Sequence, residues 1–283
     1  MKRENVVIDQ AVSYFSQEWQ LSDLRPLAEG RLVNNYLVTA YSAVYNADVV
    51  LKILLWEDAQ KYEAAALRYF DGSGCVKPLA YNEQYHALLL PYIKPGETLR
   101  TMFPVGDDRA TRILVEICKK LHGRPISGSD AAHFPTVMQW LAALDGTYNK
   151  IPKSLLEDAR SRVKRLVQRM SVMYLLHGDL HHENILHDND GWIAIDPKGV
   201  IGEREYEFGA FIRNPYPDLL AQRGVASIIH KRIALCSELS GFDPDRITDW
   251  AFVQAVMSAC WTHKVGKEDL MNYFVACAST IQH

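Results

Sequence analysis

The sequence predicts an α+β fold, in which a small antiparallel sheet of five strands with one helix precedes a larger and mainly helical part. The first observation is a series of apolar or alternating runs, rich in β-branched and aromatic residues, which is typical of strands. The second is one helical segment among them, over residues 58–70, which ends at the strong stop Asp71-Gly72-Ser73-Gly74. The third is a change to helical spacing after Pro95-Gly96. The five runs span residues 24–30, 35–45, 48–55, 75–81 and 86–93.

The second part of the chain shows the spacing of amphipathic helices. Residues 110–123 carry one apolar stripe with lysines outside it, and residues 135–148 continue the helical pattern. A long helix is predicted to open at Ser154, because Glu157 three residues later completes a capping box. Its arginines and lysines are typical of a solvated face; a nucleic-acid surface is the alternative, but no aromatic residues are interleaved with the charges. From residue 205 the helical pattern continues to the end.

Composition and charge exclude several classes of protein. With 283 residues, of which 48% are hydrophobic, the chain can bury a substantial core. The formal net charge of −3 implies no general attraction to nucleic acid. The five cysteines are widely spaced without a CxxC pair, so neither a zinc knot nor a disulfide framework is expected. The start MKRENVVIDQ lacks the apolar core of a signal peptide, and no run reaches the roughly 18 apolar residues of a membrane span. We therefore expect a cytoplasmic protein without a membrane partner.

The stretch YLLHGDLHHENILHDNDGWIAIDPKGV, residues 174–200, gathers histidines, acids and asparagines between two apolar runs. His177 and His181 have the i, i+4 spacing that binds zinc on a helix, but Gly178 and the short polar segment disfavour a helix, and HExxH is absent. A polar turn between two buried strands would explain the polarity but not the order of the residues.

That order matches the demands of phosphoryl transfer. Asn184 follows Asp179 by five positions, and Asp196 comes twelve positions later, directly after Ile195 at the end of the run WIAI. One carboxylate must orient the acceptor hydroxyl, while a neutral amide oxygen and a second carboxylate hold Mg²⁺ against the phosphates of the nucleotide. Magnesium prefers such hard oxygen ligands, so the three residues predict a nucleotide-dependent phosphotransferase.

HGDLHHEN, residues 177–184, resembles the HGDLHxxN catalytic loop of the aminoglycoside phosphotransferases, which are relatives of the protein kinases. The following IDPKG resembles more narrowly the streptomycin 6-phosphotransferase and hydroxyurea phosphotransferase branch. The resemblance implies a protein-kinase-like bilobal fold. Residues 1–92 would form a nucleotide-binding lobe, and residues 93–283 a helical lobe for catalysis and acceptor binding.

The same resemblance implies roles for individual residues. Asp179 would be the catalytic base, and Asn184 and Asp196 would bind Mg²⁺ beside ATP. His177 would be structural and hold the loop. The segment GEREYEFGAFIRNP resembles the family's segment after the metal aspartate, with Glu207 at a position usually held by Asp.

A kinase-like fold also makes demands on the first part of the chain. A lysine on the third strand should bind the phosphates and pair with a glutamate on the following helix. Lys52 lies inside VVLKILL and Glu63 inside YEAAALRYF, and EAAALR followed by DGSGCVKPL resembles the pattern of the same branch. For Lys52 the alternative is an edge-strand lysine that reaches to water, and Glu57 is a second candidate partner.

Two further segments are expected to contact the nucleotide. LLLPYIKPGETL resembles the family's link between lobes, where backbone groups hydrogen-bond adenine. Pro91 can only accept, through its carbonyl, so the donor would be the N–H of Tyr92 or Ile93. The backbone of residues 31–35 should lie over the phosphates, with Asn34 or its neighbour as a donor. No Walker-type P-loop and no GxGxxG motif occurs, which excludes the P-loop and Rossmann alternatives.

We expect ATP- and Mg²⁺-dependent transfer of the γ-phosphate to an alcohol group of a small molecule. The resemblance implies an aminoglycoside such as streptomycin as the acceptor. Lys198, two residues after the metal aspartate, would add positive charge near the transferred phosphate. Because such acceptors are polycations, an acidic pocket is expected. The apolar helix spacing around Trp250 and Trp261 is typical of a core, and the alternative is that these tryptophans and Asp249 border the pocket. Each available carboxylate could instead be a solvated surface charge, and the sequence does not choose among them: Glu203, Glu205, Asp249, Glu268 and Asp269.

Three other functions are alternatives. Relatives with the same loop phosphorylate choline, homoserine, fructosamines and sugars, and a fold carries over more safely than a substrate. A metal-dependent hydrolase would need zinc bound by the histidines. A non-catalytic nucleotide-binding regulator would be expected to lack the loop aspartate or the metal ligands, and this chain has all of them.

Overall fold

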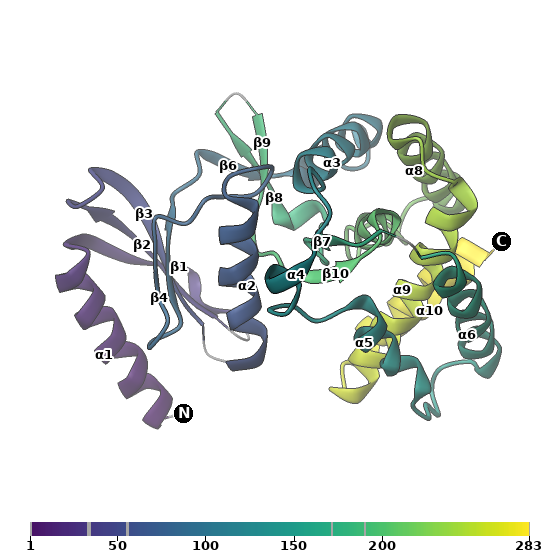
Figure 1. Ribbon diagram of the computed structural model, residues 1–283, viewed down its shortest axis with the longest axis horizontal. Helices are drawn as coiled ribbons and strands as arrows, with labels where there is room; N and C mark the ends of the chain where they lie inside the picture. The colour runs from purple at the N-terminus through teal and green to yellow at the C-terminus, as the bar shows by residue number, and fades with distance from the viewer. Residues whose placement is uncertain (1, 33–34, 55–56, 171, 190, 283) are drawn as a thin grey trace. The chain divides into compact units, whose positions relative to one another are not determined.

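The computed structural model describes residues 2–32, 35–54, 57–170, 172–189 and 191–282, and the chain divides into two compact units. The first unit contains a five-stranded antiparallel sheet, and the second consists mainly of helices (Figure 1). The predicted α+β fold, with a sheet-bearing part before a helical part, is therefore confirmed. The first unit comprises Met1–Gly96 and His187–Ile193, and the second comprises Glu97–Leu186 and Ala194–His283.

The sheet of the first unit has its third strand at the centre. Its strands are β1 (Leu21–Leu32), β2 (Asn35–Ser42), β3 (Ala47–Leu54), β4 (Ala80–Asn82) and β5 (Ala87–Pro91). They lie in the order β1-β2-β3-β5-β4, and every neighbouring pair is antiparallel. Side chains alternate along a strand, so Leu51 of β3 is buried on one face while Lys52 points to the other.

The described residues of this unit form two helices, where the sequence predicted one. α2 (Glu57–Phe70) matches the predicted helix and lies on the Lys52 face of the sheet. The prediction missed α1 (Lys2–Glu18), which covers the opposite face, so that the sheet lies between the two helices (Figure 1). The rings of Phe15 and Trp19, one helical turn apart, stack with centroids 4.3 Å apart against that face. Its buried residues Ile8, Ala11 and Phe15 recur at intervals of three and four, the spacing of an amphipathic helix, so the signal was present in the sequence.

The second unit is built around one buried helix. Its helices are α3 (Asp107–Leu121), α4 (Gly128–Ala131), α5 (Val137–Leu141), α6 (Lys153–Gln168), α7 (Phe208–Ile212), α8 (Val225–Ser240), α9 (Pro244–Lys264) and α10 (Glu268–Gln282). Every residue of α9 from Trp250 to Cys260 is buried, and α6, α7, α8 and α10 contact this helix. A helix that is apolar all round belongs in a core. None of the helices in the described part of the chain is long and apolar enough to cross a membrane.

The predicted capping box at the start of α6 is wrong. The helix begins at Lys153 with Pro152 at the N-cap position, and no side chain caps it. The proline ring already holds φ near the helical value, so the chain enters the helix early and Ser154 lies inside the first turn. A capping box occurs instead at α5, where Thr136 and Gln139 each accept a hydrogen bond from the backbone N–H of the other.

Short strands bring the catalytic-loop sequence to its position. In the second unit, β7 (Tyr174–Leu176) pairs with β10 (Val200–Gly202), so the loop that follows β7 begins at the edge of this small sheet. A three-stranded sheet in the order β6-β8-β9 contains the positions where the chain passes from one unit to the other. Its strands are β6 (Pro95–Thr98), β8 (Ile185–Asp188) and β9 (Gly191–Ala194).

Candidate active site

The loop between β7 and β8 carries HGDLHHEN, and its backbone turns sharply at Gly178. Gly178 has a φ of +82°, which L side chains rarely adopt. A Cβ at this position would lie 2.8 Å from Cγ1 of Val200 and 3.0 Å from Cη2 of Trp140. Only glycine fits this turn, which places Asp179 directly after it.

His177 is fully buried and ties the loop to the segment before Asp196. Its Nε2 lies 2.7 Å from the carbonyl oxygen of Ile195, and its Nδ1 accepts a weak hydrogen bond of 3.3 Å from the N–H of Asp179. Burial lowers the pKa of the imidazole, so the ring is neutral at neutral pH. His177 therefore has a structural position, as expected from the resemblance. Within the described ranges, no group of three or more His, Cys, Asp or Glu side chains could hold a metal, and the zinc alternative gains no support.

The side chain of Glu207 holds the start of the loop through hydrogen bonds to its backbone. Glu207 ends the short 3₁₀ helix η4 (Arg204–Glu207), and the residue is 1% exposed. Its two oxygens accept the backbone N–H groups of His177 at 2.7 Å and of Gly178 at 2.9 Å, and Nε2 of His122 lies 3.3 Å away. Burial opposes ionisation, but these hydrogen bonds and the nearby imidazoles lower the pKa of Glu207. The sequence suggested only that an acid stands here, because its partners lie in distant segments.

Asp179 is half-buried, and positive groups keep its carboxylate ionised. Burial alone would raise its pKa, but the electrostatic effects of His181, Lys198 and Arg213 lower the pKa below the usual value. The side chain of Lys198 is exposed, and the backbone N–H of Lys198 donates a hydrogen bond to the backbone carbonyl of His177 at 2.7 Å. Arg213 follows α7, is buried, and was not among the residues expected from the sequence. A carboxylate with a low pKa suits the orientation of a hydroxyl and late acceptance of its proton, not early abstraction.

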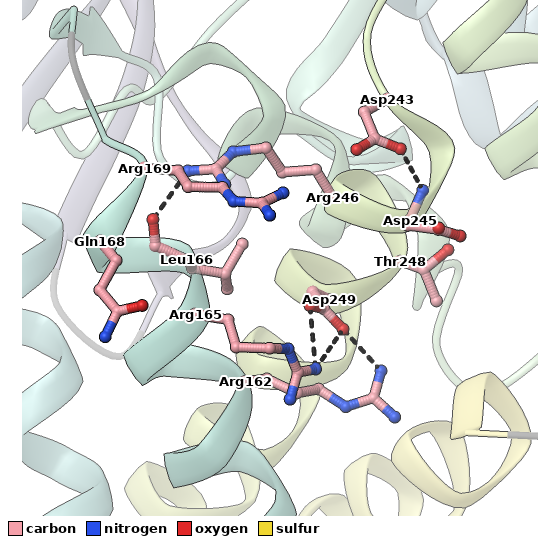
Figure 2. A pocket seen from close by; sticks show the side chains of 10 residues that line it. All are labelled: Arg162, Arg165, Leu166, Gln168, Arg169, Asp243, Asp245, Arg246, Thr248 and Asp249. Atoms are coloured by element: carbon pink, nitrogen blue, oxygen red, sulfur yellow. Dashed lines mark hydrogen bonds and ion pairs between the residues drawn. The ribbon is translucent and has the colours of Figure 1, made fainter.

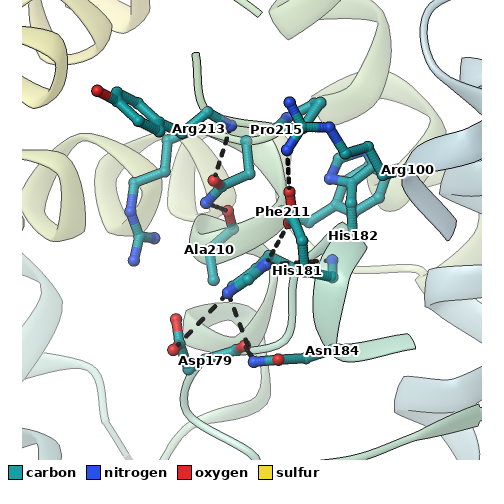
Figure 3. Close-up of polar contacts among 12 residues, drawn as sticks. Arg100, Asp179, His181, His182, Asn184, Ala210, Phe211, Arg213 and Pro215 are labelled. Atoms are coloured by element: carbon teal, nitrogen blue, oxygen red, sulfur yellow. Dashed lines mark hydrogen bonds and ion pairs between the residues drawn. The ribbon is translucent and has the colours of Figure 1, made fainter. Parts of the chain in front are cut away.

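Asn184 and Asp196 come from adjoining segments of the second unit. The backbone carbonyl of Asn184 accepts a hydrogen bond from the N–H of Ile195 at 2.9 Å. Asp196 is the next residue in the chain, so this bond holds its backbone close to that of Asn184. The amide nitrogen of Asn184 donates to the carbonyl of Asp179 at 2.9 Å, which leaves the amide oxygen for another partner (Figure 3). Asp196 has a φ of +59°, a strained conformation that often marks a functional position. One amide oxygen and one carboxylate on adjoining segments fit a hard cation such as Mg²⁺.

Lys52 and Glu63 form a buried ion pair in the first unit. Nζ of Lys52 lies 2.8 Å from Oε1 of Glu63, and Lys52 is 1% exposed. The alternative of an edge-strand lysine is excluded, because β3 lies between β2 and β5. A buried lysine is tolerated only with such a partner. The side chain of Glu57, the other candidate partner, lies outside the described residues.

The hydrogen bonds at the end of β5 show how the backbone groups expected to contact adenine are oriented. The N–H of Tyr92 donates to the carbonyl of Asp48 at 3.1 Å, so it is occupied and Ile93 is the other candidate donor. Hydrogen-bonded and non-hydrogen-bonded pairs alternate in an antiparallel ladder. The neighbouring pair of Val49 and Pro91 is therefore a non-hydrogen-bonded pair, and the Pro91 carbonyl points away from β3.

The backbone expected to cover the phosphates lies partly in strands: Arg31 and Leu32 of β1 pair with Tyr36 and Asn35 of β2. Asn34, the candidate donor to the phosphates, lies outside the described residues.

A pocket of about 630 Å³ lies in the second unit between α6 and α9, and its walls are rich in arginine (Figure 2). Asp249 is one of the carboxylates expected to attract a cationic acceptor. Its oxygens lie 3.0 Å from Nη1 of Arg162 and 3.2 Å from Nη2 of Arg165. The carboxylate is thus neutralised within the protein, and the basic face of α6 is partly paired instead of wholly solvated.

Other members of the expected acidic pocket are also engaged elsewhere. Glu203 is buried against Arg246 and accepts a hydrogen bond from the indole of Trp250, while Glu268 pairs with Lys150 at 2.7 Å. Trp250 is fully buried and packs in the core around α9, so the alternative that it borders an open acceptor pocket is excluded. Trp261 is 38% exposed and contacts Trp140 edge-on, so it is accessible to a ligand.

Replacing His182 with Phe is expected to make the protein more resistant to acid. His182 is fully buried and stacks on Phe211 with ring centroids 4.1 Å apart. Burial, and then the charge of Arg232, lower its pKa well below the usual 6.5. As the pH falls below 6.5, His182 therefore becomes protonated in the unfolded chain but stays neutral in the folded protein. The contribution of His182 to the unfolding free energy, present above that pH, is then lost. This site should cost up to about 1.4 kcal/mol of unfolding free energy per pH unit.

Urea unfolding of the wild type and of His182→Phe at about pH 7.5 and about pH 5.5 measures this difference. The variant should lose less unfolding free energy between the two conditions. An equal loss in both proteins would show that His182 does not contribute to acid sensitivity.

The chain resembles known proteins over most of its length. Residues 35–266 match the family described as aminoglycoside/hydroxyurea antibiotic resistance kinase. The streptomycin 3''-kinase of Klebsiella pneumoniae is 31% identical over 201 residues, which cover 69% of this chain and 73% of that protein. The streptomycin 6-kinase of Streptomyces glaucescens is 26% identical over 244 residues, which cover 82% and 76%. The hydroxyurea phosphotransferase of Kitasatospora aureofaciens is 25% identical over 282 residues, which cover 95% and 77%.

Solved structures show the same fold at low sequence identity. A thermostable mutant of the aminoglycoside phosphotransferase APH(4)-Ia, in complex with ADP and hygromycin B, superposes with a TM-score of 0.70 at 14% identity, covering 95% of this chain and 97% of that one. The choline kinase LicA from Streptococcus pneumoniae has a TM-score of 0.67 at 15% identity, covering 97% and 99%. The fold is therefore protein-kinase-like. The family match extends over most of the sequence, and so the chain belongs to the aminoglycoside/hydroxyurea antibiotic resistance kinase family and is an enzyme that transfers phosphate to a hydroxyl group.

Proposed function

We propose that the protein transfers the γ-phosphate of ATP to a hydroxyl group of an aminoglycoside of the streptomycin type. The observation that carries this proposal is the loop that holds an ionised Asp179 beside Asn184, whose backbone is bonded to the segment of Asp196. Two of the similar proteins named above are streptomycin kinases, which supports this class of acceptor. The chain would thereby inactivate an antibiotic.

The first unit supplies the groups that we assign to the nucleotide. Lys52, held by Glu63, binds phosphate oxygens, as a buried lysine paired with a helix glutamate does in kinases. The Pro91 carbonyl accepts from the amino group of adenine, and the N–H of Ile93 donates to a ring nitrogen. Guanine presents an acceptor and a donor in the opposite order, so ATP is preferred over GTP. We accordingly assign residues 1–92 as the nucleotide-binding lobe and residues 93–283 as the lobe for catalysis and the acceptor.

In the second unit, Asn184 and Asp196 would hold Mg²⁺. When bound, the metal neutralises charge on the phosphates and fixes their geometry. Asp179 orients the acceptor hydroxyl and takes its proton as the bond to phosphorus forms. Such late proton transfer suits a loose transition state, in which the attacking oxygen loses its proton only after most of the bond to the leaving group is broken. Lys198 adds positive charge near the transferred phosphate, and unchanged turnover in Lys198→Ala would remove that role.

Transfer of labelled γ-phosphate from ATP in the presence of Mg²⁺ tests the proposal. The acceptors are streptomycin, hygromycin B, hydroxyurea, choline, homoserine and a simple sugar. Hydroxyurea is the second candidate, because its phosphotransferase is similar to this chain along 95% of the sequence. Labelled streptomycin would support the proposal. If only hydroxyurea or only choline were labelled, that compound would be the acceptor instead of streptomycin. Absence of labelling on every acceptor would contradict the proposed reaction.

Replacing Lys52 with Met is expected to lower kcat/KM by about 100-fold or more, since one preorganised cation on the phosphates is typically worth this much. Met preserves the length and apolar stem of the buried side chain. The matched control is Lys77→Met, because Lys77 is exposed and pairs with exposed Asp71. Steady-state kinetics with ATP as the varied substrate measure the effect, and thermal unfolding checks the fold. If Lys52→Met keeps wild-type kinetics, Lys52 does not bind the phosphates.

A further inference from the structure

We infer that His181 is a positioning residue for Asn184, held in one tautomer by Glu183 so that the oxygen of the asparagine amide stays directed to the metal. The inference rests on the proposed function, in which Asn184 is a Mg²⁺ ligand. His181, Glu183 and Asn184 lie in the second unit, in the loop after β7 and the short 3₁₀ helix η3 (His182–Asn184). Figure 3 shows His181 beside Asn184 and Asp179.

The first step is the contact between His181 and Glu183. Nδ1 of His181 lies 2.8 Å from Oε2 of Glu183. A contact this short between a ring nitrogen and a carboxylate needs a hydrogen between them, because two lone pairs would repel. The backbone N–H of Glu183 also approaches Nδ1, but at 3.3 Å this contact is longer and weaker. The hydrogen of the neutral ring is therefore on Nδ1, and Nε2 presents a lone pair.

Arg100 holds Glu183 in place for this contact. Its Nη1 lies 2.9 Å from Oε1 of Glu183, the oxygen that does not contact His181. Nη2 of the same guanidinium lies 2.6 Å from Oδ2 of Asp218. Each Glu183 oxygen thus has its own partner, and the carboxylate cannot rotate away from the imidazole without losing an ion pair.

The second step is the contact between His181 and Asn184. The amide nitrogen of Asn184 lies 2.9 Å from the carbonyl of Asp179 and 3.4 Å from Nε2 of His181. Nε2 is 3.8 Å from Oδ2 of Asp179, which is too long for a hydrogen bond, so its lone pair is available to the amide. Both amide hydrogens are then directed at acceptors, and the amide oxygen is the end left for a cation.

The opposite tautomer would break this arrangement. An Nε2–H would face the N–H of Asn184, and the amide would lose one of its two restraints. Residues that orient a metal ligand in this way typically change metal affinity by about 10- to 100-fold when replaced. Arg100, Glu183 and His181 do not bind the metal themselves. Through these successive contacts, however, each of them affects the binding of the metal by Asn184.

The experiment measures the dissociation constant of the ATP analogue AMP-PNP by intrinsic fluorescence, with and without Mn²⁺ as a substitute for Mg²⁺. The dissociation constant without Mn²⁺ divided by that with Mn²⁺ is the ratio that reports how strongly the metal promotes nucleotide binding. We expect Glu183→Gln and His181→Phe to reduce this ratio about tenfold while the metal-free constant stays unchanged. His181→Gln should keep the wild-type ratio, because its amide oxygen can replace the Nε2 lone pair. Asp108→Asn, at an exposed carboxylate of α3, is the matched control.

Each other outcome overturns the inference in a distinguishable way. A wild-type ratio in both Glu183→Gln and His181→Phe would mean that neither residue positions Asn184. Equal losses in the metal-free and metal-dependent constants would mean general damage to the site. A loss in His181→Gln as large as in His181→Phe would exclude the acceptor role of Nε2. If Mn²⁺ does not strengthen AMP-PNP binding to the wild type, the proposed metal site itself fails, and the inference with it.

Discussion

Replacing Asp179 with Asn is expected to lower kcat by about 100- to 10,000-fold, the usual contribution of a positioned general base. The amide of Asn has nearly the same shape as the carboxylate, but it cannot take up the proton of the acceptor hydroxyl. The backbone contacts of this residue, its N–H to His177 and its carbonyl to Asn184, do not depend on the side chain. The loss should therefore appear in kcat, with the KM for ATP and the thermal stability close to wild type. Steady-state kinetics on the acceptor identified by labelling measure it.

The control for this substitution is Asp108→Asn, which makes the same chemical change at an exposed position of α3. A kcat within a factor of about three of wild type in Asp179→Asn would show that Asp179 neither orients nor deprotonates the acceptor. An equal fall in kcat and in thermal stability would indicate that the loop, not the chemistry, depends on this carboxylate.

Replacing Glu207 with Gln is expected to cost about 3 kcal/mol of unfolding free energy, because it breaks a buried set of charged hydrogen bonds. The glutamate has two acceptor oxygens, each occupied by a backbone N–H of the catalytic loop. In Gln one of these oxygens becomes an NH₂ group, which must oppose the N–H of His177 or Gly178. Because the same N–H groups shape the turn before Asp179, we expect kcat to fall as well. Urea unfolding near neutral pH and steady-state kinetics measure the two effects.

The pH dependence distinguishes this carboxylate from a merely space-filling side chain. The pKa of Glu207 is lowered in the folded protein, so its contribution is present above the pKa of the unfolded chain and is lost as the pH falls through the folded value. The difference in stability between wild type and Glu207→Gln should thus shrink in acid, below about pH 4. Glu238→Gln, at an exposed position of α8, should leave stability unchanged at every pH. A constant difference between Glu207→Gln and wild type would contradict the role of the charge.

The sequence by itself determined the fold class and predicted the chemistry of the loop. Strand-like runs before residue 93 and helical spacing after residue 96 predicted the sheet-bearing and helical parts, because side-chain periodicity is a local property of each element. The order of Asp179, Asn184 and Asp196 predicted a phosphotransferase for a similar reason. Phosphoryl transfer needs particular residue types, and close spacing in the chain keeps them within reach of one another.

Only the tertiary structure decided which groups support those residues. Glu207 stands 30 positions from His177 in the chain, so no local pattern could reveal that it binds the loop. Burial also depends on contacts between distant segments: Trp250, which could have bordered a pocket, packs in the core around α9. Asp249 was expected to attract a cation, but it is neutralised by arginines from α6. The free energy of a charged group depends on its surroundings in space, and these follow from packing, whereas periodicity and motif order are written along the chain.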